Sequence, residues 1–294
     1  PRDGSTRSEI MKAADIALYA AKAAGRGQVK IFEPSMKAEV ERREEMMAAA
    51  REALREDRVR PYFQPKVALK TGRVVGFEAL LRWTDADGAL RAPEDLRPAF
   101  DDPILGAAIS DRMIDRTFAR MQDWDEAEVE FGHVALNATA GDFRRDGYAE
   151  GVLGRLAQRG IDTARLQIEV TETVFLGRGA GHVEAALRAL SDAGVRIALD
   201  DFGTGYSSLS YLHTLPLDKV KIDRSFLIDV TRSPRSLELL KGIVNLSRSL
   251  GLTVTIEGVE TFEQLKTLSV DVKPELVQGF LFGAALSASG IETM

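Results

Sequence analysis

From about Arg60 onward, short apolar runs alternate with amphipathic helical stretches, and this rhythm most constrains what the chain can fold into. Apolar runs separated by helices are typical of parallel strands in an α/β fold. The predicted strands are Tyr62–Val67, Val74–Leu81, Val134–Asn137, Leu166–Val170, Val195–Leu199, Lys219–Ile222, Thr253–Ile256 and Leu276–Phe280. Eight runs of this kind predict a (β/α)8 barrel of the TIM type.

The first two runs are separated only by a short turn at Lys70–Gly72. Parallel strands need a crossover of about a dozen residues or more, and this turn has no room for one. We therefore expect the first strand pair to be antiparallel, which departs from a regular barrel.

Composition narrows the class of protein. The chain has 294 residues, no cysteine and a formal net charge of −6. Disulfides and thiolate metal sites are excluded, which fits a reducing compartment, and we expect a cytoplasmic protein. The acidic balance argues against general nucleic-acid binding, and no apolar run is long enough to predict a membrane span.

The N-terminal region divides differently from the barrel region. Residues 1–34 contain a helical pattern, Glu9–Ala24, followed by a predicted strand, Val29–Phe32. Residues 35–57 predict one charged linking helix with Ser35 as its N-cap. Such a helix is either a solvated face or a coupling element between domains. Residues 58–294 form the predicted barrel domain. The chain begins at Pro1, so we expect a fragment of a longer protein, whose upstream part could carry sensor or membrane domains.

Almost every predicted strand carries a polar or acidic residue at or near its C-terminal end. These residues are Glu78 and Arg82, Asn137, Glu169 and Glu172, Asp200 and Asp201, Lys221 and Asp223, Glu257 and Glu260, and Gln278. A carboxylate on an apolar strand is costly to bury unless it is paired or binds a metal. The C-terminal ends of barrel strands meet at one mouth, where barrel enzymes keep their sites.

Several carboxylates around one mouth would repel one another without cations. Oxygen-rich clusters suit Mg²⁺ or Mn²⁺, and the adjacent pair Asp200–Asp201 could hold two such ions, the usual arrangement for cleaving a phosphodiester. Each residue alone has a structural alternative. Glu78 or Lys221 could be an ion-pair partner, and Asp200–Asp201 could cap a helix. The histidines His133, His182 and His213 lack zinc-ligand spacing and are interpreted as packing or surface residues.

These same residues resemble the EAL-domain family of cyclic di-GMP phosphodiesterases, over about residues 52–286. The motifs that carry the resemblance are Gln64-Pro65, Glu78-Ala79-Leu80 with Leu81-Arg82-Trp83, Asp200-Asp201 through Ser208, Lys221-Ile222-Asp223, Glu257-Gly258-Val259-Glu260 and Gln278-Gly279. Residues Ala14–Tyr19, Ala21-Lys22 and Gly25–Gly27 resemble the C-terminal end of a GGDEF domain, whose catalytic loop is missing from this chain. The resemblance implies a GGDEF–EAL tandem linked by residues 35–57.

The resemblance also implies a role for each matched residue. Glu78, Asn137, Glu169 and Asp200 would bind a first metal ion, and Asp200 with Asp201 would hold a second. Lys221 would orient the attacking water, and Glu257 would bind that water or a metal ion and act as base. Gln64, Arg82, Asp223, Glu260 and Gln278 would bind substrate, and Glu172 would stabilise the Asp200–Ser208 loop. The product would be linear pGpG, and a homodimer through the barrel is a further expectation.

Two other functions remain open. A degenerate EAL domain could bind cyclic di-GMP as a sensor, but such a domain would be expected to lack metal ligands that are all present here. An unrelated acidic barrel enzyme, such as an enolase-like lyase that uses Mg²⁺, would not be expected to carry these motifs in this order.

Overall fold

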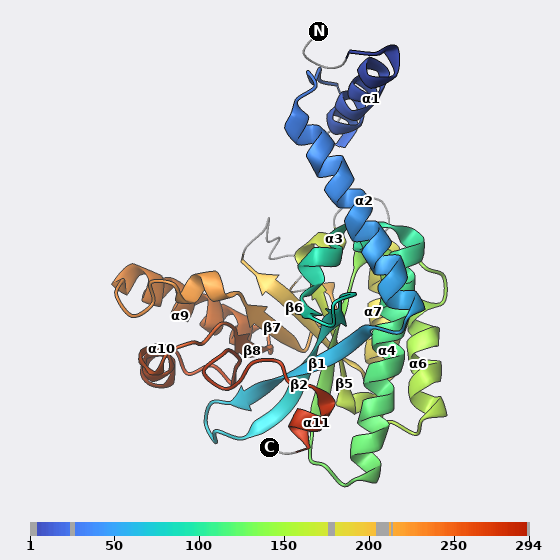
Figure 1. Cartoon of the computed structure of the whole chain (residues 1–294). Helices are drawn as coiled ribbons and strands as arrows, with labels where there is room; N and C mark the ends of the chain where they lie inside the picture. The colour runs from blue at the N-terminus through green and yellow to red at the C-terminus, as the bar shows by residue number, and fades with distance from the viewer. Residues whose placement is uncertain (1–4, 24–26, 176–179, 204–211, 213, 293–294) are drawn as a thin grey trace.

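The structure, a computed structural model, describes residues 5–23, 27–175, 180–203, 212 and 214–292. Within these residues, eight strands form a closed barrel (Figure 1). The barrel strands are β1 (Val59–Ala68), β2 (Val74–Thr84), β4 (His133–Ala138), β5 (Leu166–Thr171), β6 (Arg196–Phe202), β7 (Lys219–Ile222), β8 (Thr253–Ile256) and β9 (Leu276–Val277). The predicted α/β barrel is confirmed, with strand ends displaced by a few residues.

β1 runs antiparallel to both of its neighbours in the barrel. It pairs with β2 along most of its length and with β9 at Val67 and Ala68, and the β1–β2 pairing closes the ring. The turn between β1 and β2 ends at Gly72, whose φ of 68° is readily adopted by glycine. The predicted antiparallel pair is therefore confirmed. A two-residue strand, β3 (Leu90–Arg91), extends β2 as a short hairpin that the sequence pattern did not predict.

Helices surround the barrel and lead up to it (Figure 1). They are α1 (Arg7–Ala23), α2 (Pro34–Arg55), α3 (Arg97–Asp101), α4 (Pro103–Glu126), α5 (Ala140–Phe143), α6 (Tyr148–Gln158), α7 (Ala180–Asp192), α9 (Pro234–Ser249), α10 (Phe262–Thr267) and α11 (Ala288–Ile291). Two 3-10 turns follow barrel strands: η3 (Glu172–Phe175) after β5 and η4 (Arg224–Leu227) after β7. No helix in the described ranges combines the length and the apolar character that a membrane span requires.

The main core lies between the outer faces of the strands and the helices that cover them. Trp124 of α4 is fully buried, and its ring lies 4.8 Å from that of Phe63 on β1 and 5.2 Å from that of Phe131. A second apolar cluster joins the end of α2 to β2 through Ala50, Ala53 and Leu81. The C-terminal half of α2 is thus anchored to the strand that carries Glu78.

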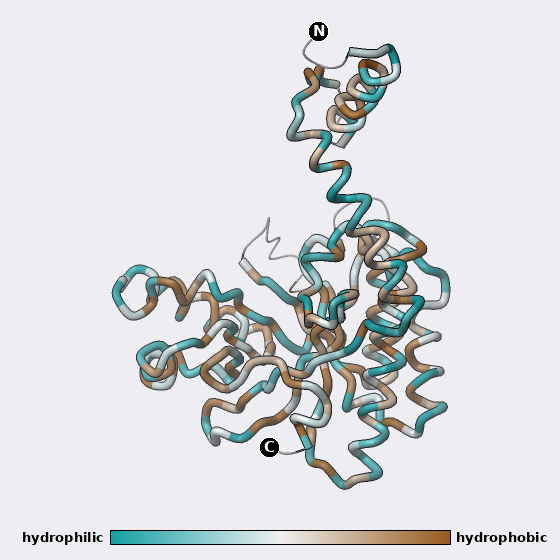
Figure 2. The backbone as a smooth tube through the Cα atoms, in the orientation of Figure 1, coloured by the Kyte–Doolittle hydropathy of each residue, from teal (hydrophilic) through white to brown (hydrophobic). Residues whose placement is uncertain are grey.

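The N-terminal region corrects two predictions. Val29–Phe32 forms no strand: Val29 and Ile31 are 93% and 79% exposed, and neither has a strand partner in the described part of the chain. The linking helix is present, but Ser35 is not its N-cap. The helix begins at Pro34 and Glu33 occupies the cap position, because proline is favoured at the first helical position. Figure 2 shows that α2 is mainly hydrophilic where it projects from the barrel.

Candidate functional site

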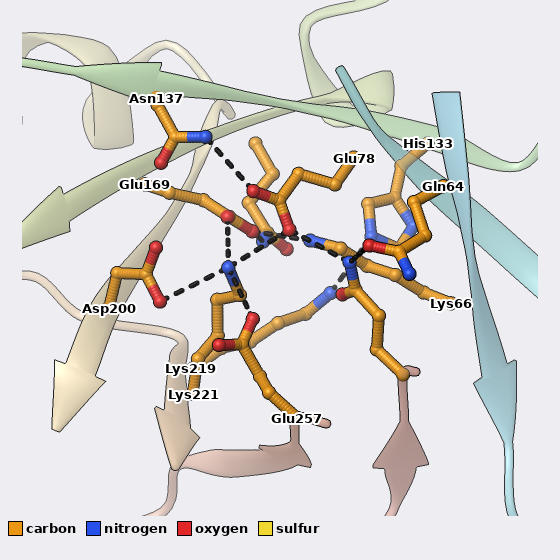
Figure 3. A network of polar contacts seen from close by, with 12 residues as sticks. Gln64, Lys66, Glu78, His133, Asn137, Glu169, Asp200, Lys219, Lys221 and Glu257 are labelled. Atoms are coloured by element: carbon orange, nitrogen blue, oxygen red, sulfur yellow. Dashed lines mark hydrogen bonds and ion pairs between the residues drawn. The ribbon is translucent and has the colours of Figure 1, made fainter. Parts of the chain in front are cut away.

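One ammonium group lies at the centre of the barrel mouth. Lys221 comes from β7, and its side chain is 1% exposed (Figure 3). Four carboxylates, carried by β2, β5, β6 and the residue after β8, surround its Nζ atom, at 2.5 Å for Glu169 Oε2, 2.7 Å for Glu257 Oε1, and 3.1 Å for both Asp200 Oδ1 and Glu78 Oε2. The structure therefore brings together residues from five strands that are far apart in sequence.

Charge balance governs the protonation of this cluster. Burial opposes the charge on Lys221, but the surrounding carboxylates, Asp200 and Glu169 foremost, raise the pKa of Lys221 well above its ordinary value. Burial also raises the pKa of Asp200 well above its usual range. Lys221 opposes this increase, whereas the neighbouring acids Glu257 and Glu169 add to it. Burial raises the pKa of Glu257 in the same way, with Lys221 again opposing and Glu78 adding to the increase.

A bulge in β6 directs two adjacent aspartates to the mouth. Two residues, Asp200 and Asp201, lie between the pairs Leu199–Val220 and Phe202–Ile222, whereas β7 has only Lys221 between the same pairs. Asp201 has a left-handed φ of 51°, an uncommon conformation for a residue other than glycine. Successive residues of a regular strand point to opposite faces, so the bulge is what lets both carboxylates serve one site.

The carboxylates form two groups with the spacing of cation ligands. Glu78, Glu169 and Asp200 offer oxygens within 4.8 Å of one another, and so do Asp200, Asp201 and Glu257. Among the described residues, the ammonium groups that contact Glu78, Glu169, Asp200 and Glu257 are those of Lys221 and Lys66. Full ionisation therefore leaves an excess of two negative charges on these four acids, before Asp201 is counted. One divalent cation would balance that excess. An all-oxygen donor set of this kind fits Mg²⁺ or Mn²⁺.

Three amide side chains complete the surroundings of Glu78. Asn137 Nδ2 donates to Glu78 Oε1 at 2.9 Å, which leaves the Asn137 amide oxygen as the atom that could bind a cation. Gln278 Nε2 donates to Glu78 Oε2 at 2.9 Å and to Gln64 Oε1 at 3.1 Å. Gln64 in turn donates to the carbonyl oxygen of Gly283 at 3.2 Å. These bonds hold Glu78 in one orientation.

A pocket of about 430 Å³ opens beside the carboxylates. Of the residues expected to bind substrate or act in catalysis, it is lined by Gln64, Glu257, Asp223, Glu260 and Gln278. Glu78, Leu80, Glu94, Arg224, Gly258, Gly279 and Phe280 complete the lining. Gly258 has a φ of 69°, and a Cβ atom there would lie 2.3 Å from Arg224 Cβ, so the chain can turn beneath the pocket only with glycine at this position.

Other predicted residues lie at the edge of this arrangement. Arg82 lies on β2 beyond Leu80, outside the pocket lining, and its Nη1 donates to the Leu81 carbonyl oxygen at 2.8 Å. Asp223 caps η4 by accepting from the Ser225 backbone N–H at 2.9 Å. Glu172 accepts from the backbone N–H of Gly203 at 3.4 Å, at the start of the loop it was expected to stabilise. Residues 204–208 of that motif, and His213, lie outside the described residues.

Sequence reasoning missed a polar layer inside the barrel. Lys66 contacts Glu169 Oε1, and Gln167 Nε2 donates to the same oxygen at 2.6 Å. Lys219 Nζ lies 3.2 Å from His133 Nε2, and His133 is buried, which agrees with its interpretation as a packing residue. A signal was present: Gln64 with Lys66, and Gln167 with Glu169, are polar residues two apart, the spacing of one strand face.

Comparison with known proteins gives a family match over the region that contains these site residues. The EAL domain family matches residues 47–285. The chain is 35% identical over 304 residues to "Cyclic di-GMP phosphodiesterase NbdA" of Pseudomonas aeruginosa, covering 99% of this chain and 37% of that protein. It is 35% identical over 288 residues to "Bifunctional diguanylate cyclase/cyclic di-GMP phosphodiesterase MucR" of the same organism, covering 98% of this chain and 42% of that protein. The chain thus spans less than half the length of these curated relatives.

Solved structures have the same fold. "PaMucR Phosphodiesterase, c-di-GMP complex" superposes with a TM-score of 0.78 at 33% identity, covering 84% of this chain and 99% of that one. The EAL domain protein from Listeria monocytogenes EGD-e gives a TM-score of 0.71 at 30% identity, covering 84% of this chain and 96% of that one. With a family match that spans most of its length, this chain belongs to the EAL-domain family.

Proposed function

We propose that this chain hydrolyses cyclic di-GMP to linear pGpG with the help of Mg²⁺ or Mn²⁺, and so lowers the level of this second messenger in bacterial signalling. Support comes from family membership, from relatives named as cyclic di-GMP phosphodiesterases, and from the carboxylate cluster at the barrel mouth. Water would add to one phosphorus atom while the bond between that phosphorus atom and the 3′ oxygen breaks. A 5′-phosphate and a free 3′-hydroxyl result.

The observation that carries this proposal is the position of Asp200. Its carboxylate belongs to both groups of closely spaced oxygens, and Asp201 stands beside it on the bulge. Two sites that share one carboxylate are suited to two neighbouring ions. When bound, such ions would neutralise the charge that develops on the phosphate and lower the pKa of the attacking water. In the proposed set, Glu78, Asn137, Glu169 and Asp200 hold one ion, and Asp200, Asp201 and Glu257 hold the other.

The chain's own residues have separate tasks in this proposal. Lys221 is surrounded by four carboxylates and stays protonated, so it suits orienting a water molecule and not removing a proton from it. Glu257 has a raised pKa and its side chain is 20% exposed at the pocket, so its carboxylate suits accepting the proton of the water. A general base works best when its pKa lies near the working pH.

The pocket residues supply the substrate contacts. Gln64 and Gln278 present amides next to Glu78, and Asp223 and Glu260 offer acceptors suited to guanine N–H groups. Arg82 stands just outside the lining, where a guanidinium could pair with a phosphate. Glu172 accepts from the backbone N–H of Gly203, at the start of the loop that it would stabilise.

The organisation of the parent protein belongs to the same proposal. We assign residues 1–34 to the end of a GGDEF domain, residues 35–57 to a linking helix and residues 58–294 to the EAL barrel. Support comes from a relative named as both cyclase and phosphodiesterase, which aligns with 98% of the chain. Homodimerisation through the barrel and a cytoplasmic location complete the proposal.

A metal-dependent hydrolysis assay tests the proposed activity. The purified chain is stripped with EDTA and incubated with cyclic di-GMP in the presence of Mg²⁺, Mn²⁺ or no metal, and products are separated by chromatography. We expect pGpG only when a divalent ion is present. Binding of cyclic di-GMP without pGpG formation would contradict the proposal and favour a receptor function.

A further inference from the structure

The barrel interior one layer below the carboxylates is polar. Barrel interiors are usually filled by valine, isoleucine and leucine. Here Gln167 lies two residues before Glu169 on β5, and Lys219 lies two residues before Lys221 on β7. Lys66 on β1 and His133 on β4 occupy the same layer, and all four side chains are at most 6% exposed. Buried polar groups of this kind need partners, and their partners reveal what they do.

The two oxygens of Glu169 have different partners. Oε1 accepts from Gln167 Nε2 at 2.6 Å and from the ammonium group of Lys66, whose side chain extends toward Glu169 in Figure 3. Oε2 faces the mouth and contacts Lys221 Nζ at 2.5 Å. With one oxygen taken by two donors, the carboxylate cannot rotate without breaking both contacts.

From this geometry we infer that Lys66 and Gln167 are positioning residues that hold Glu169 so that it binds its metal ion through Oε2 alone. The inference rests on the proposed function, because it assumes that Glu169 is a metal ligand. Neither residue lines the substrate pocket, and Glu169 is the proposed metal ligand that each of them contacts. Groups that hydrogen-bond a metal ligand commonly change metal affinity by about 10–100-fold when they are removed.

A competing effect makes the inference testable. Lys66 carries a positive charge near the proposed ion, so a purely electrostatic role would weaken cation binding, and removal of that charge would strengthen it. Gln167 is neutral, and its replacement by another neutral residue cannot act through net charge. Lys219 is a matched control, because it is buried in the same layer but contacts His133 instead of a carboxylate.

The experiment measures the affinity of the metal-free chain for Mn²⁺ by titration calorimetry in Lys66→Met, Gln167→Met and Lys219→Met variants. We expect Lys66→Met and Gln167→Met each to weaken Mn²⁺ binding by about tenfold or more, and Lys219→Met to change it by less than about threefold. In turnover, the two positioning variants should lower kcat while the KM for cyclic di-GMP stays within about twofold of the parent value.

The outcomes separate this inference from the proposed function. If the parent binds Mn²⁺ and forms pGpG, but Lys66→Met and Gln167→Met bind Mn²⁺ as tightly as the parent or more tightly, the positioning role is overturned while the function stands. If Lys66→Met does not fold, Gln167→Met decides alone by the same criterion. If the parent binds no Mn²⁺, both the metal site and the positioning role are wrong.

Discussion

The Nζ atom of Lys221 lies 2.7 Å from Oε1 of Glu257, and this contact joins the C-terminal end of β7 to the residue that follows β8. Lys221 is fully enclosed, whereas the Glu257 side chain retains 20% exposure toward the pocket. The pair therefore connects the buried carboxylates to the space where a substrate would lie.

Replacement of Lys221 by methionine should separate catalysis from metal binding. We expect kcat to fall by about a hundredfold or more, because the group that orients the water is lost. Without metal, the free energy of unfolding should decrease by roughly 3–5 kcal/mol, since buried carboxylates lose their shared cation. Steady-state assays and denaturant titrations with and without Mn²⁺ measure both effects. A variant that turns over at the parent rate would show that Lys221 has only a structural role.

Replacement of Glu78 by alanine should abolish turnover. Glu78 is a member of the first carboxylate group and is oriented by Asn137 and Gln278, so its loss removes a proposed ligand. Chromatography of the products at saturating Mn²⁺ measures the effect. Glu130→Ala is the matched control, because Glu130 is 91% exposed and pairs only loosely with Arg73. Near-parent rates in Glu78→Ala would contradict the assignment.

Replacement of Arg82 by alanine should weaken substrate binding with the metal sites intact. Arg82 lies on β2 two residues beyond Leu80 of the pocket lining, and a guanidinium can pair with a phosphate through two hydrogen bonds. We expect KM to rise by about tenfold or more and Mn²⁺ affinity to stay unchanged. Arg82→Lys keeps the charge without the fork geometry and should give an intermediate KM. An unchanged KM in Arg82→Ala would argue against a phosphate contact.

Replacement of Asp201 by asparagine should weaken the binding of one proposed metal ion and leave the binding of the other unchanged. Asparagine tolerates the left-handed conformation of this position, so the bulge should persist while one negative charge is lost. Calorimetry with Mn²⁺ should show one weakened site, and activity should need higher Mn²⁺ concentrations. Two unchanged binding events would mean that Asp201 is no ligand. Asp201→Gly also keeps the backbone and should give the same result.

The stability of the fold should rise with pH above neutrality because of Lys219. Burial, with Lys66 adding to the effect, lowers the pKa of Lys219 from 10.5 to about 7. Between these two values the unfolded chain binds more protons than the folded one, so the free energy of unfolding increases with pH across that window. Burial lowers the pKa of His133, its neighbour, to about 2, so His133 stays neutral there.

Denaturant titrations of the metal-free chain at pH 7 and pH 10 test this prediction. Lys219→Met removes the buried ammonium group, so its stability should increase less between the two pH values than that of the parent. Other titrating groups are shared by both proteins and cancel in the difference. Equal increases in the two proteins would mean that Lys219 is not the group responsible.

Much of the fold could be read from local patterns. The apolar runs around Glu78, Glu169 and Lys221 became β2, β5 and β7, because β-branched residues fit a pleated strand that is buried on both faces. The run Val29–Phe32 has the same composition but forms no strand. A strand needs a neighbour for its backbone groups, and none of the described residues pairs with this segment.

The sequence by itself determined that acidic residues gather at one mouth. In a parallel barrel all C-terminal strand ends face the same side, so a residue's place along its own strand decides its layer. The polar partners of these acids were not readable in the same way. Lys66 lies 103 positions from Glu169, and their contact depends on how β1 closes against the other strands.

Only the tertiary structure decided which groups share a proton, a charge or a proposed ion. The bulge at Asp200 and Asp201, the enclosure of Lys221 by four carboxylates and the contact of Lys66 with Glu169 all arise from the register between strands. Register is set by the packing of the whole barrel, because a slip of one residue would turn each side chain to the opposite face. Local sequence therefore specified which residues reach the mouth, and closure of the barrel specified what each one touches.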